Sequence, residues 1–272
     1  MEAIYLFALK KLSEASINSQ KKRRETLKMA MGIKVPDYNL KGMPLVNNIR
    51  AGRAISQAFN DKQGGVKVVA APPGSGKTTY IRSSMNSFID SGGKARMLAS
   101  EFRKEDDFYA AFGGEDNRLI LFDILPLRSL IVIDQLEHFR PLPTEIEGLI
   151  LHLACESCRT AECNVLISVS DSTLATKVLD INGLHKIKAA GRATDFRWGK
   201  EEVATFINHG CVNWSEENNV MFAHLGMLAG SPAFMNSVLC MFPSGLPSDI
   251  KSIRLNAMSF DRRWTEFEEC GL

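Results

Sequence analysis

The stretch Ala71-Pro72-Pro73-Gly74-Ser75-Gly76-Lys77-Thr78-Thr79 decides the fold of this chain. The apolar, β-branched run of residues 66–69 precedes it, and residues 80–90, which can form a helix, follow it. A glycine-rich loop between a strand and a helix presents bare backbone N–H groups and the positive end of the helix, and both attract phosphate. Glycines at positions 74 and 76 allow positive φ angles and a close backbone approach. The order of strand, loop and helix therefore predicts a nucleoside triphosphate site on an α/β fold.

Different side chains of the loop are expected to contact different parts of the nucleotide. Lys77 is expected to neutralise the outer phosphates, and the Thr78 hydroxyl can bind Mg²⁺. The alternative is a glycine turn that follows a strand by chance. The loop resembles the Walker A motif of P-loop NTPases, with Ala71 in the first position of the pattern. The resemblance implies that ATP is bound by Pro73, Gly74, Ser75, Gly76, Lys77, Thr78 and Thr79.

A second buried strand is predicted over residues 129–133, Ser-Leu-Ile-Val-Ile, and it delivers Asp134 at its carboxyl end. Short apolar runs of this kind are typical of a parallel sheet covered on both faces. Ligands bind at the carboxyl edge of such sheets, so Asp134 should face the loop and, together with Thr78, hold Mg²⁺. The run resembles Walker B. The alternative is a core strand that happens to end in an aspartate.

The residue after Asp134 bears on hydrolysis. In many AAA+ ATPases a glutamate stands there and polarises the attacking water, whereas this chain has Gln135. A glutamine can orient water without taking its proton, which permits slow hydrolysis. Glu137 is the second candidate for this role, and its alternative is an exposed residue in a loop or at a helix start. Gln135 and Glu137 are therefore both candidate catalytic residues, together with Lys77.

A further strand is predicted over residues 164–170, and it ends in serines followed by an aspartate. In AAA+ proteins and in the related STAND signalling ATPases, a polar residue at this strand end contacts the γ-phosphate, a role called sensor 1. The resemblance assigns this role to Ser170, with Ser168 as the second choice. The alternative is that these hydroxyls cap a helix over residues 172–180.

Two later segments indicate a lid. Residues 195–207 resemble the passage at which AAA+ and STAND proteins leave the sheet and begin a helical lid. Further on, Gly230-Ser231-Pro232 resembles the Gly-x-Pro turn of STAND lids. This resemblance implies that Pro232 lies near the adenine, whereas the alternative is an ordinary turn between two helices.

Together these features predict a three-layer parallel α/β sheet of the AAA+ type with a C-terminal α-helical lid. A chain of 272 residues that is 45% hydrophobic can bury such a core and a small second unit. The predicted division is a basic helical segment over residues 1–40, a P-loop NTPase domain over 41–198 and a lid over 199–272. Strands are expected near residues 66–70, 95–99, 118–122, 129–133 and 164–169.

The charge of the chain is unevenly distributed. Residues 1–66 carry twelve Lys and Arg against five Asp and Glu, whereas the whole chain has 33 against 31. The most basic stretch, Lys21-Lys22-Arg23-Arg24, can bind nucleic acid or serve as a nuclear address. The alternative is a solvated helix face, because no aromatic residues are interleaved to stack on bases.

Other patterns bear on compartment and metals. No run approaches eighteen apolar residues, so neither a membrane-spanning helix nor a membrane partner is expected. The expected location is intracellular, cytoplasmic or nuclear, and a mitochondrial presequence over residues 1–19 is the alternative. Four residues could share a zinc ion, but without a second cysteine pair they are better explained as buried small hydrophobic residues. These four are His152, Cys155, Cys158 and Cys163.

Three function classes follow. The first is a slow Mg²⁺-dependent ATPase that acts as a nucleotide-driven switch or assembly factor, through self-assembly or a protein partner. The second is an ATP-dependent nucleic-acid factor of the transposition or helicase-loading kind. The third is an interaction module that binds ATP without hydrolysing it.

Overall fold

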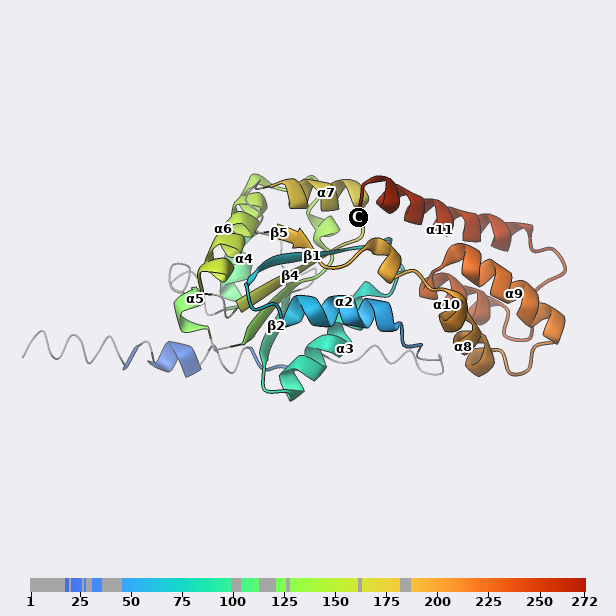
Figure 1. Cartoon of the computed structure of the whole chain (residues 1–272), viewed down its shortest axis with the longest axis horizontal. Helices are drawn as coiled ribbons and strands as arrows, with labels where there is room; N and C mark the ends of the chain where they lie inside the picture. Colours follow the sequence, from blue (N-terminus) through green and yellow to red (C-terminus); the bar gives the residue numbers. More distant parts are fainter. Residues whose placement is uncertain are drawn as a thin grey trace, which may run out of the picture.

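A central parallel sheet with helices on both faces leads into a separate helical unit (Figure 1). The computed structural model describes residues 18–19, 21–25, 27, 31–35, 46–98, 104–112, 121–125, 128–160, 163–181 and 187–272.

Five parallel strands form the sheet, in the order β2-β3-β4-β1-β5. Strands β1, β3 and β4 are buried along their whole length, as expected of central strands rich in branched apolar residues. The register pairs Val69 with Ser168 and Ile133 with Ile167, so the carboxyl ends of β1, β3 and β4 meet at one edge. The strands are β1 (Gly65–Ala70), β2 (Lys94–Leu98), β3 (Ser129–Ile133), β4 (Cys163–Val169) and β5 (Ile187–Ala189).

Helices cover the two faces of the sheet in separate layers. Helices α2 and α3 lie on one face, and α4, α6 and α7 lie on the other (Figure 1). This arrangement confirms the three-layer α/β prediction. The bounds are α2 (Ile49–Phe59), α3 (Lys77–Asp90), α4 (Glu105–Ala110), α5 (Leu121–Ile124), α6 (Thr144–Thr160) and α7 (Ser172–Asp180).

One predicted strand is wrong and one real strand was not predicted. Leu121 and Phe122, expected at the end of a strand over residues 118–122, begin helix α5 instead, and residues 118–120 lie outside the described part of the chain. A short apolar run fits a buried helix as well as a strand, and here both side chains enter the main core. The fifth strand is β5, which pairs with β1 and has only one buried residue in three.

The C-terminal unit is an α-helical lid, as predicted. Its own core combines aliphatic side chains with aromatic ones, including Phe206, Phe222 and Phe234. The last helix belongs to both units, because Ala257 packs in the lid core while Trp264 packs in the main core. The helices are α8 (Lys200–Gly210), α9 (Glu216–Ala229), α10 (Pro232–Met241) and α11 (Lys251–Glu269).

The described part of the N-terminal segment packs on the sheet domain. Residues 18–19, 21–25 and 27 are helical, and the side chains of Leu27 and Met31 are buried in the main core. Val35 donates its backbone N–H to Asn86 Oδ1 at 3.3 Å, and Asn86 Nδ2 donates to the Val35 carbonyl at 3.0 Å. The basic segment is therefore attached to α3. Within the described ranges, no helix is long and apolar enough to cross a membrane.

Candidate nucleotide-binding site

The loop between β1 and α3 has a backbone that only glycine supports. Gly74 and Gly76 have φ angles of 78° and 88°, in the left-handed region. A Cβ added at Gly74 would lie 2.7 Å from the Ala233 Cβ, and one at Gly76 would lie 3.1 Å from the Tyr80 ring. The Ser75 side chain is buried, and among the described residues its hydroxyl has no hydrogen-bond partner. The loop thus forms a tight turn, and its buried Ser75 hydroxyl is available for a hydrogen bond to a ligand.

Lys77, the first residue of α3, is folded back into the loop and is 5% exposed. Its Nζ donates to the carbonyl oxygens of Ala71 at 2.6 Å and Pro72 at 3.1 Å. Burial lowers the pKa of Lys77 to about 8, although the carboxylates of Glu137 and Asp134 act in the opposite direction. A buried ammonium group that is bonded mainly to carbonyl oxygens is stabilised by a nearby anion. A phosphate beside the loop would supply that negative charge.

Asp134 follows β3 directly and faces the loop, as the sequence predicts for a metal-site residue. Its backbone N–H continues the sheet by donating to the Leu98 carbonyl at 2.8 Å, which fixes where the side chain emerges. Thr78 Oγ1 donates to Asp134 Oδ2 at 3.0 Å, and the Ser168 hydroxyl donates to Asp134 Oδ1. Lys77, Thr78 and Asp134 therefore come together from two separate strand ends.

The two candidate water-positioning residues have different surroundings. Gln135 has a φ of 61° and its Oε1 lies 3.0 Å from His138 Nε2, on the exposed side of the turn. Glu137 is half-buried, and its Oε2 accepts the Ser170 N–H at 3.1 Å. Among the charges that raise the pKa of Lys77, the Glu137 carboxylate acts more strongly than Asp134. Glu137 is thus a carboxylate that favours the charged form of Lys77.

The two serines at the end of β4 make different contacts. Ser168, the second choice, is 1% exposed, and besides bonding Asp134 its Oγ accepts the Gln135 N–H at 2.9 Å. Ser170 holds Glu137 through its backbone rather than its hydroxyl. Neither serine hydroxyl caps α7, because Asp171 does so by accepting the Leu174 N–H at 2.7 Å. The capping alternative for the serines is therefore wrong.

The lid contacts the loop through the turn that contains Pro232. Ser231 Oγ donates to the Gly74 carbonyl at 3.0 Å, and the Ala233 N–H donates to the same oxygen at 3.2 Å. Pro232 Cγ lies 3.4 Å from the place that a Cβ on Gly76 would occupy. Ser231 also caps α10 by accepting the Phe234 N–H at 3.3 Å. Ser231 is a site residue that the sequence analysis missed.

A clasp holds the lid against the sheet domain behind this turn. Arg197, just before α8, forms an ion pair with Asp261 of α11 at 2.6 Å and donates to the Leu228 carbonyl at 3.3 Å. The same guanidinium lies 6.0 Å from the centre of the Trp264 ring. The backbone N–H of Trp198 donates to the Gly230 carbonyl at 2.9 Å. The position of the turn thus depends on the connection between the two units.

Tyr80 lies beside the glycine loop. Its ring lies against Gly76, and its hydroxyl donates to the Val46 carbonyl at 3.3 Å. Burial raises the pKa of Tyr80, so the phenol stays neutral and keeps its proton for this bond. Pro232 lies against the same glycine, and these two rings therefore border one part of the loop. An aromatic residue four positions into a helix carries no distinctive sequence signal, so Tyr80 was not predicted as a site residue.

The remaining predicted positions lie elsewhere or on the surface. Pro73 and Thr79 are exposed on the outer side of the loop and of α3. Of the four residues considered as zinc ligands, only Cys163 is buried in the main core, and the other three are half-buried on α6. Within the described residues, no group of three or more possible ligands is placed to hold a metal.

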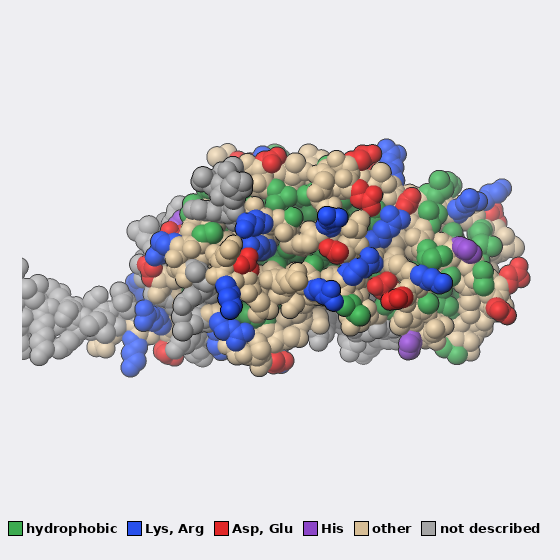
Figure 2. All heavy atoms as spheres, viewed as in Figure 1, with side chains coloured by type: hydrophobic (Ala, Val, Ile, Leu, Met, Phe, Trp, Pro, Cys, Tyr) green, Lys and Arg blue, Asp and Glu red, His purple; other side chains and the backbone are tan. Residues whose placement is uncertain are grey.

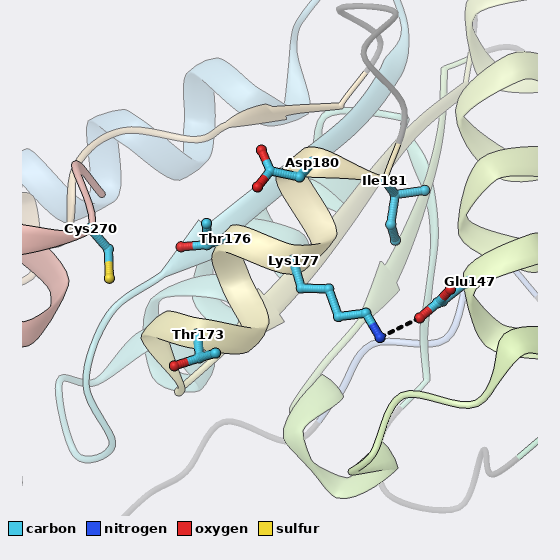
Figure 3. A pocket seen from close by; sticks show the side chains of 7 residues that line it. All are labelled: Glu147, Thr173, Thr176, Lys177, Asp180, Ile181 and Cys270. Atoms are coloured by element: carbon cyan, nitrogen blue, oxygen red, sulfur yellow. Dashed lines mark ion pairs between the residues drawn. The ribbon is translucent and has the colours of Figure 1, made fainter.

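A separate cavity of about 630 Å³ lies along α7, next to the end of α11 (Figure 3). Thr173 and Asp180 line it from α7, and Cys270 lines it from the end of α11. Lys177 forms an ion pair with Glu147 of α6 at 2.5 Å across one side. The described lining contains none of the predicted nucleotide-site residues, so this cavity is distinct from the loop.

Comparison with known proteins identifies the fold. No protein-family model matches the chain, and no curated protein matches it. Among solved structures, the Walker-type ATPase PABY2304 of Pyrococcus abyssi matches with a TM-score of 0.52 and 11% identity, over 88% of this chain and 78% of that one. Domain III of the Thermotoga maritima replication initiation protein DnaA matches with a TM-score of 0.48 and 12% identity, over 86% and 96%. The first of these matches shows that the chain shares the α/β fold of a Walker-type ATPase, and the chain has a C-terminal helical region.

Proposed function

We propose that this protein binds ATP with Mg²⁺ at the loop of residues 71–78, hydrolyses it slowly, and acts as a nucleotide-driven switch or assembly factor. One observation carries the proposal: Lys77, Thr78 and Asp134 converge at a glycine loop between β1 and α3. A chance turn after a strand would not bring a buried lysine and a buried aspartate from another strand to the same place. The fold, shared with a Walker-type ATPase, supports the proposal.

The residues present fit the phosphate chain and the metal. The buried Ser75 hydroxyl lacks a partner among the described residues, and a triphosphate oxygen would satisfy it. Thr78 Oγ1 and the Asp134 carboxylate are 3.0 Å apart, and both are oxygen ligands of the kind that Mg²⁺ prefers. Mg²⁺, when bound there, neutralises charge on the phosphates. Lys77 would exchange its bonds to the Ala71 and Pro72 carbonyls for the outer phosphates.

The water-positioning role falls to Glu137, with Gln135 as the alternative. Glu137 supplies a carboxylate near Lys77 and is tethered to the backbone of Ser170. Gln135 is instead paired with His138 on the exposed side of the turn. A carboxylate two positions later than in many AAA+ ATPases is expected to be less well aligned with the phosphate, which accounts for slow turnover. Ser168 orients Asp134, and this role differs from the γ-phosphate contact proposed for Ser170.

The lid supplies the switch. Because Ser231 and Ala233 both donate to the Gly74 carbonyl, a change in the loop on phosphate binding is transmitted directly to α10. The STAND-type resemblance further assigns Pro232 to the adenine side, and its place against Gly76 supports this. Replacing Pro232 with alanine should then weaken ATP and GTP to different extents, measured as two dissociation constants.

Nucleotide binding by variants at Lys77 tests the proposal. Lys77→Ala should abolish ATP binding in titration calorimetry, because it removes the cation of the loop. Lys62→Ala, which changes an exposed lysine in the turn before β1, is the matched control and should bind like the wild type. Wild-type affinity in Lys77→Ala would show that the loop is not the nucleotide site.

The described basic helix supports a second candidate function, an ATP-dependent nucleic-acid factor. Lys21, Lys22 and Arg24 are exposed, and Arg24 also donates to the Asp123 carbonyl at 3.5 Å. Exposed cations on one short helix suit phosphate backbones, whose binding weakens steeply with salt. A Lys21→Glu/Lys22→Glu variant should lose a salt-dependent DNA affinity while it keeps ATP binding. A wild type that does not bind DNA at low salt would exclude this function. If the wild type also binds ATP without hydrolysing it, the third class remains, an ATP-binding interaction module.

A further inference from the structure

Exposed apolar side chains gather on the lid rather than on the sheet domain. Of the ten large hydrophobic residues described as exposed, seven lie between residues 212 and 258. Figure 2 shows these green side chains collecting over the lid, at the end of the molecule farthest from the basic helix. We define the lid apolar patch as Val220, Met221 and Met227 of α9 with Leu255 and Met258 of α11.

Helix α9 has the composition of a helix that is covered on more than one side. Phe222 and Leu225 face the lid core, yet Val220 and Met221 of the same helix are 54% and 41% exposed. A helix that is apolar all round is normally buried, whereas a surface helix keeps its outer face polar. A neighbouring helix, α11, adds Leu255, which is 67% exposed. Single exposed apolar residues are ordinary, but a group on two packed helices marks an interaction surface.

The surface beside α9 is hollow and partly acidic. A hollow of about 710 Å³ is lined by Glu216, Glu217, Val220, Met221 and His224. An apolar floor with carboxylates at one end suits an amphipathic segment that carries basic residues. Methionine side chains adapt to the shape of such a segment, because they are unbranched and flexible.

Residues 1–17 of this chain have that chemistry. They contain the apolar cluster Ile4-Tyr5-Leu6-Phe7, followed by Lys10 and Lys11. Within residues 1–17, Lys10 and Lys11 are balanced in number by Glu2 and Glu14, so the segment is basic only at this pair. The lid over residues 199–272 carries five Lys and Arg against nine Asp and Glu. Docking would therefore pair the apolar cluster with the apolar floor of the hollow, and the two lysines with Glu216 and Glu217.

The segment and the patch lie at opposite ends of the molecule. Residues 18–19 and 21–25, which follow the segment, lie at one end of the long axis, and α9 lies at the other (Figure 1). This separation favours a contact between two copies over a contact within one copy. We propose that the lid apolar patch binds residues 1–17 of a second copy of this chain, in a head-to-tail assembly. Such a heterologous contact leaves a free segment and a free patch on every assembly that does not close into a ring.

Mass measurement by light scattering tests the proposal on the full chain. At concentrations up to roughly 100 µM, where micromolar contacts are populated, the wild type should show multiples of the monomer mass. Deletion of residues 1–17 and the patch variant Val220→Glu/Met221→Glu should each give monomers. Val212→Glu is the matched control, because Val212 is 76% exposed and lies outside the patch, and it should assemble like the wild type.

A mixture of the two defective variants distinguishes the head-to-tail contact from other arrangements. The deletion variant keeps a working patch, and the patch variant keeps a working segment. Mixed in equal amounts, they should form heterodimers and nothing larger, because one functional contact remains in each pair. Since the segment is tested separately by Ile4→Asp/Phe7→Asp in the full-length chain, a folding defect of the deletion variant would not obscure the result.

Three results would each overturn the proposal. A wild type that stays monomeric over the whole concentration range has no such contact. A deletion or patch variant that assembles like the wild type uses a different surface. A mixture that remains monomeric shows a symmetric or an intramolecular contact instead. ATP binding, measured on the same variants, should be unchanged, so this inference and the proposed nucleotide site fail independently.

Discussion

The carboxyl edge of the sheet and the lid meet at the same loop, but they hold it by different contacts. At the edge, buried side chains interact with one another, and Lys77, Asp134 and Ser168 are each at most 5% exposed. At the lid, one hydroxyl and one backbone N–H donate to a single carbonyl, that of Gly74. Buried charges depend strongly on their partners, whereas neutral hydrogen bonds contribute about 1 kcal/mol each. The carboxyl edge of the sheet therefore carries the candidate catalytic groups. The lid instead contributes a weaker contact with the loop, which can form and break.

The largest effect is expected from removing the acidic group of the edge. Asp134→Ala should lower kcat for ATP hydrolysis about 100- to 1,000-fold, because the variant loses the carboxylate beside Thr78. Steady-state phosphate release at saturating Mg²⁺ measures the change. Asp180→Ala, an exposed carboxylate of α7, is the control and should keep wild-type turnover. A decrease of less than tenfold in Asp134→Ala would mean that the edge does not hold the chemistry.

A smaller loss is expected from the half-buried carboxylate beside Lys77. Glu137→Gln should lower kcat about 100-fold with little change in KM, because a glutamine keeps the bond to Ser170 but accepts no proton. Gln135→Glu should raise kcat, since it restores a carboxylate directly after Asp134. Glu145→Gln, at the exposed start of α6, serves as the control.

A further variant, Gln135→Ala, is compared with Glu137→Gln to decide between the two candidates. If Glu137→Gln hydrolyses ATP at the wild-type rate while Gln135→Ala loses activity, then Gln135 is the water-positioning residue. The reverse pattern assigns the role to Glu137. If the wild type and both variants bind ATP tightly and none of them hydrolyses it, the protein belongs to the class that binds ATP without hydrolysis.

The charge of Lys77 should make the stability of the nucleotide-free protein depend on pH. The folded protein holds the pKa of Lys77 near 8, below the ordinary 10.5, because the side chain is buried. Between these values the unfolded chain binds more protons, so the free energy of unfolding rises with pH. The rise should be about 2 kcal/mol from pH 8 to pH 9.5. Denaturant unfolding of the wild type and of Lys77→Met, which lacks the titrating group, measures it.

The comparison of the two pH profiles is the decisive quantity. Other groups titrate in both proteins and cancel in the difference. A Lys77→Met profile parallel to that of the wild type would mean that the ammonium is solvated in the folded state. Such a result would also weaken the view that the edge contains a buried cation that requires an anion.

Local patterns predicted the main part of the fold. The apolar runs of β1, β3 and β4 are visible because central parallel strands are buried on both faces. By contrast, β5 has one buried residue in three, so it leaves no apolar run to detect. The wrong strand at residues 118–122 has the opposite cause, because an apolar run also fits the buried start of α5. Burial pattern is informative for strands only where both faces are covered.

The candidate site was predictable only in part, and for a similar reason. Lys77 and Asp134 follow from local spacing at two strand ends, and the parallel register brings those ends together. The choice between Ser168 and Ser170 depends on which side chain turns toward Asp134, and that is a long-range property. Ser231 belongs to a distant lid turn, 157 residues from the Gly74 carbonyl that it contacts. Sequence patterns identify residues that a motif places, but not residues that tertiary packing brings to it.

The smallest effect is expected from the lid contact, and it needs two variants of one residue. Ser231→Ala removes both the cap of α10 and the bond to Gly74, so the free energy of unfolding should fall by about 1 kcal/mol. Ser231→Asp keeps a capping oxygen but cannot donate to the carbonyl. Its unfolding free energy should therefore stay near that of the wild type while the lid contact is lost.

Hydrogen exchange separates these two consequences. The Ala233 N–H donates to Gly74 and reports the lid contact, whereas the Phe234 N–H donates to Ser231 and reports the cap. In Ser231→Asp, exchange at Ala233 should become faster while Phe234 stays protected, because a carboxylate facing the Gly74 carbonyl pushes the turn away. Equal protection at both positions would show that the backbone bond alone holds the lid. The adjustable contact would then lie in the Arg197–Asp261 clasp, and an Arg197→Lys variant should show the faster exchange instead.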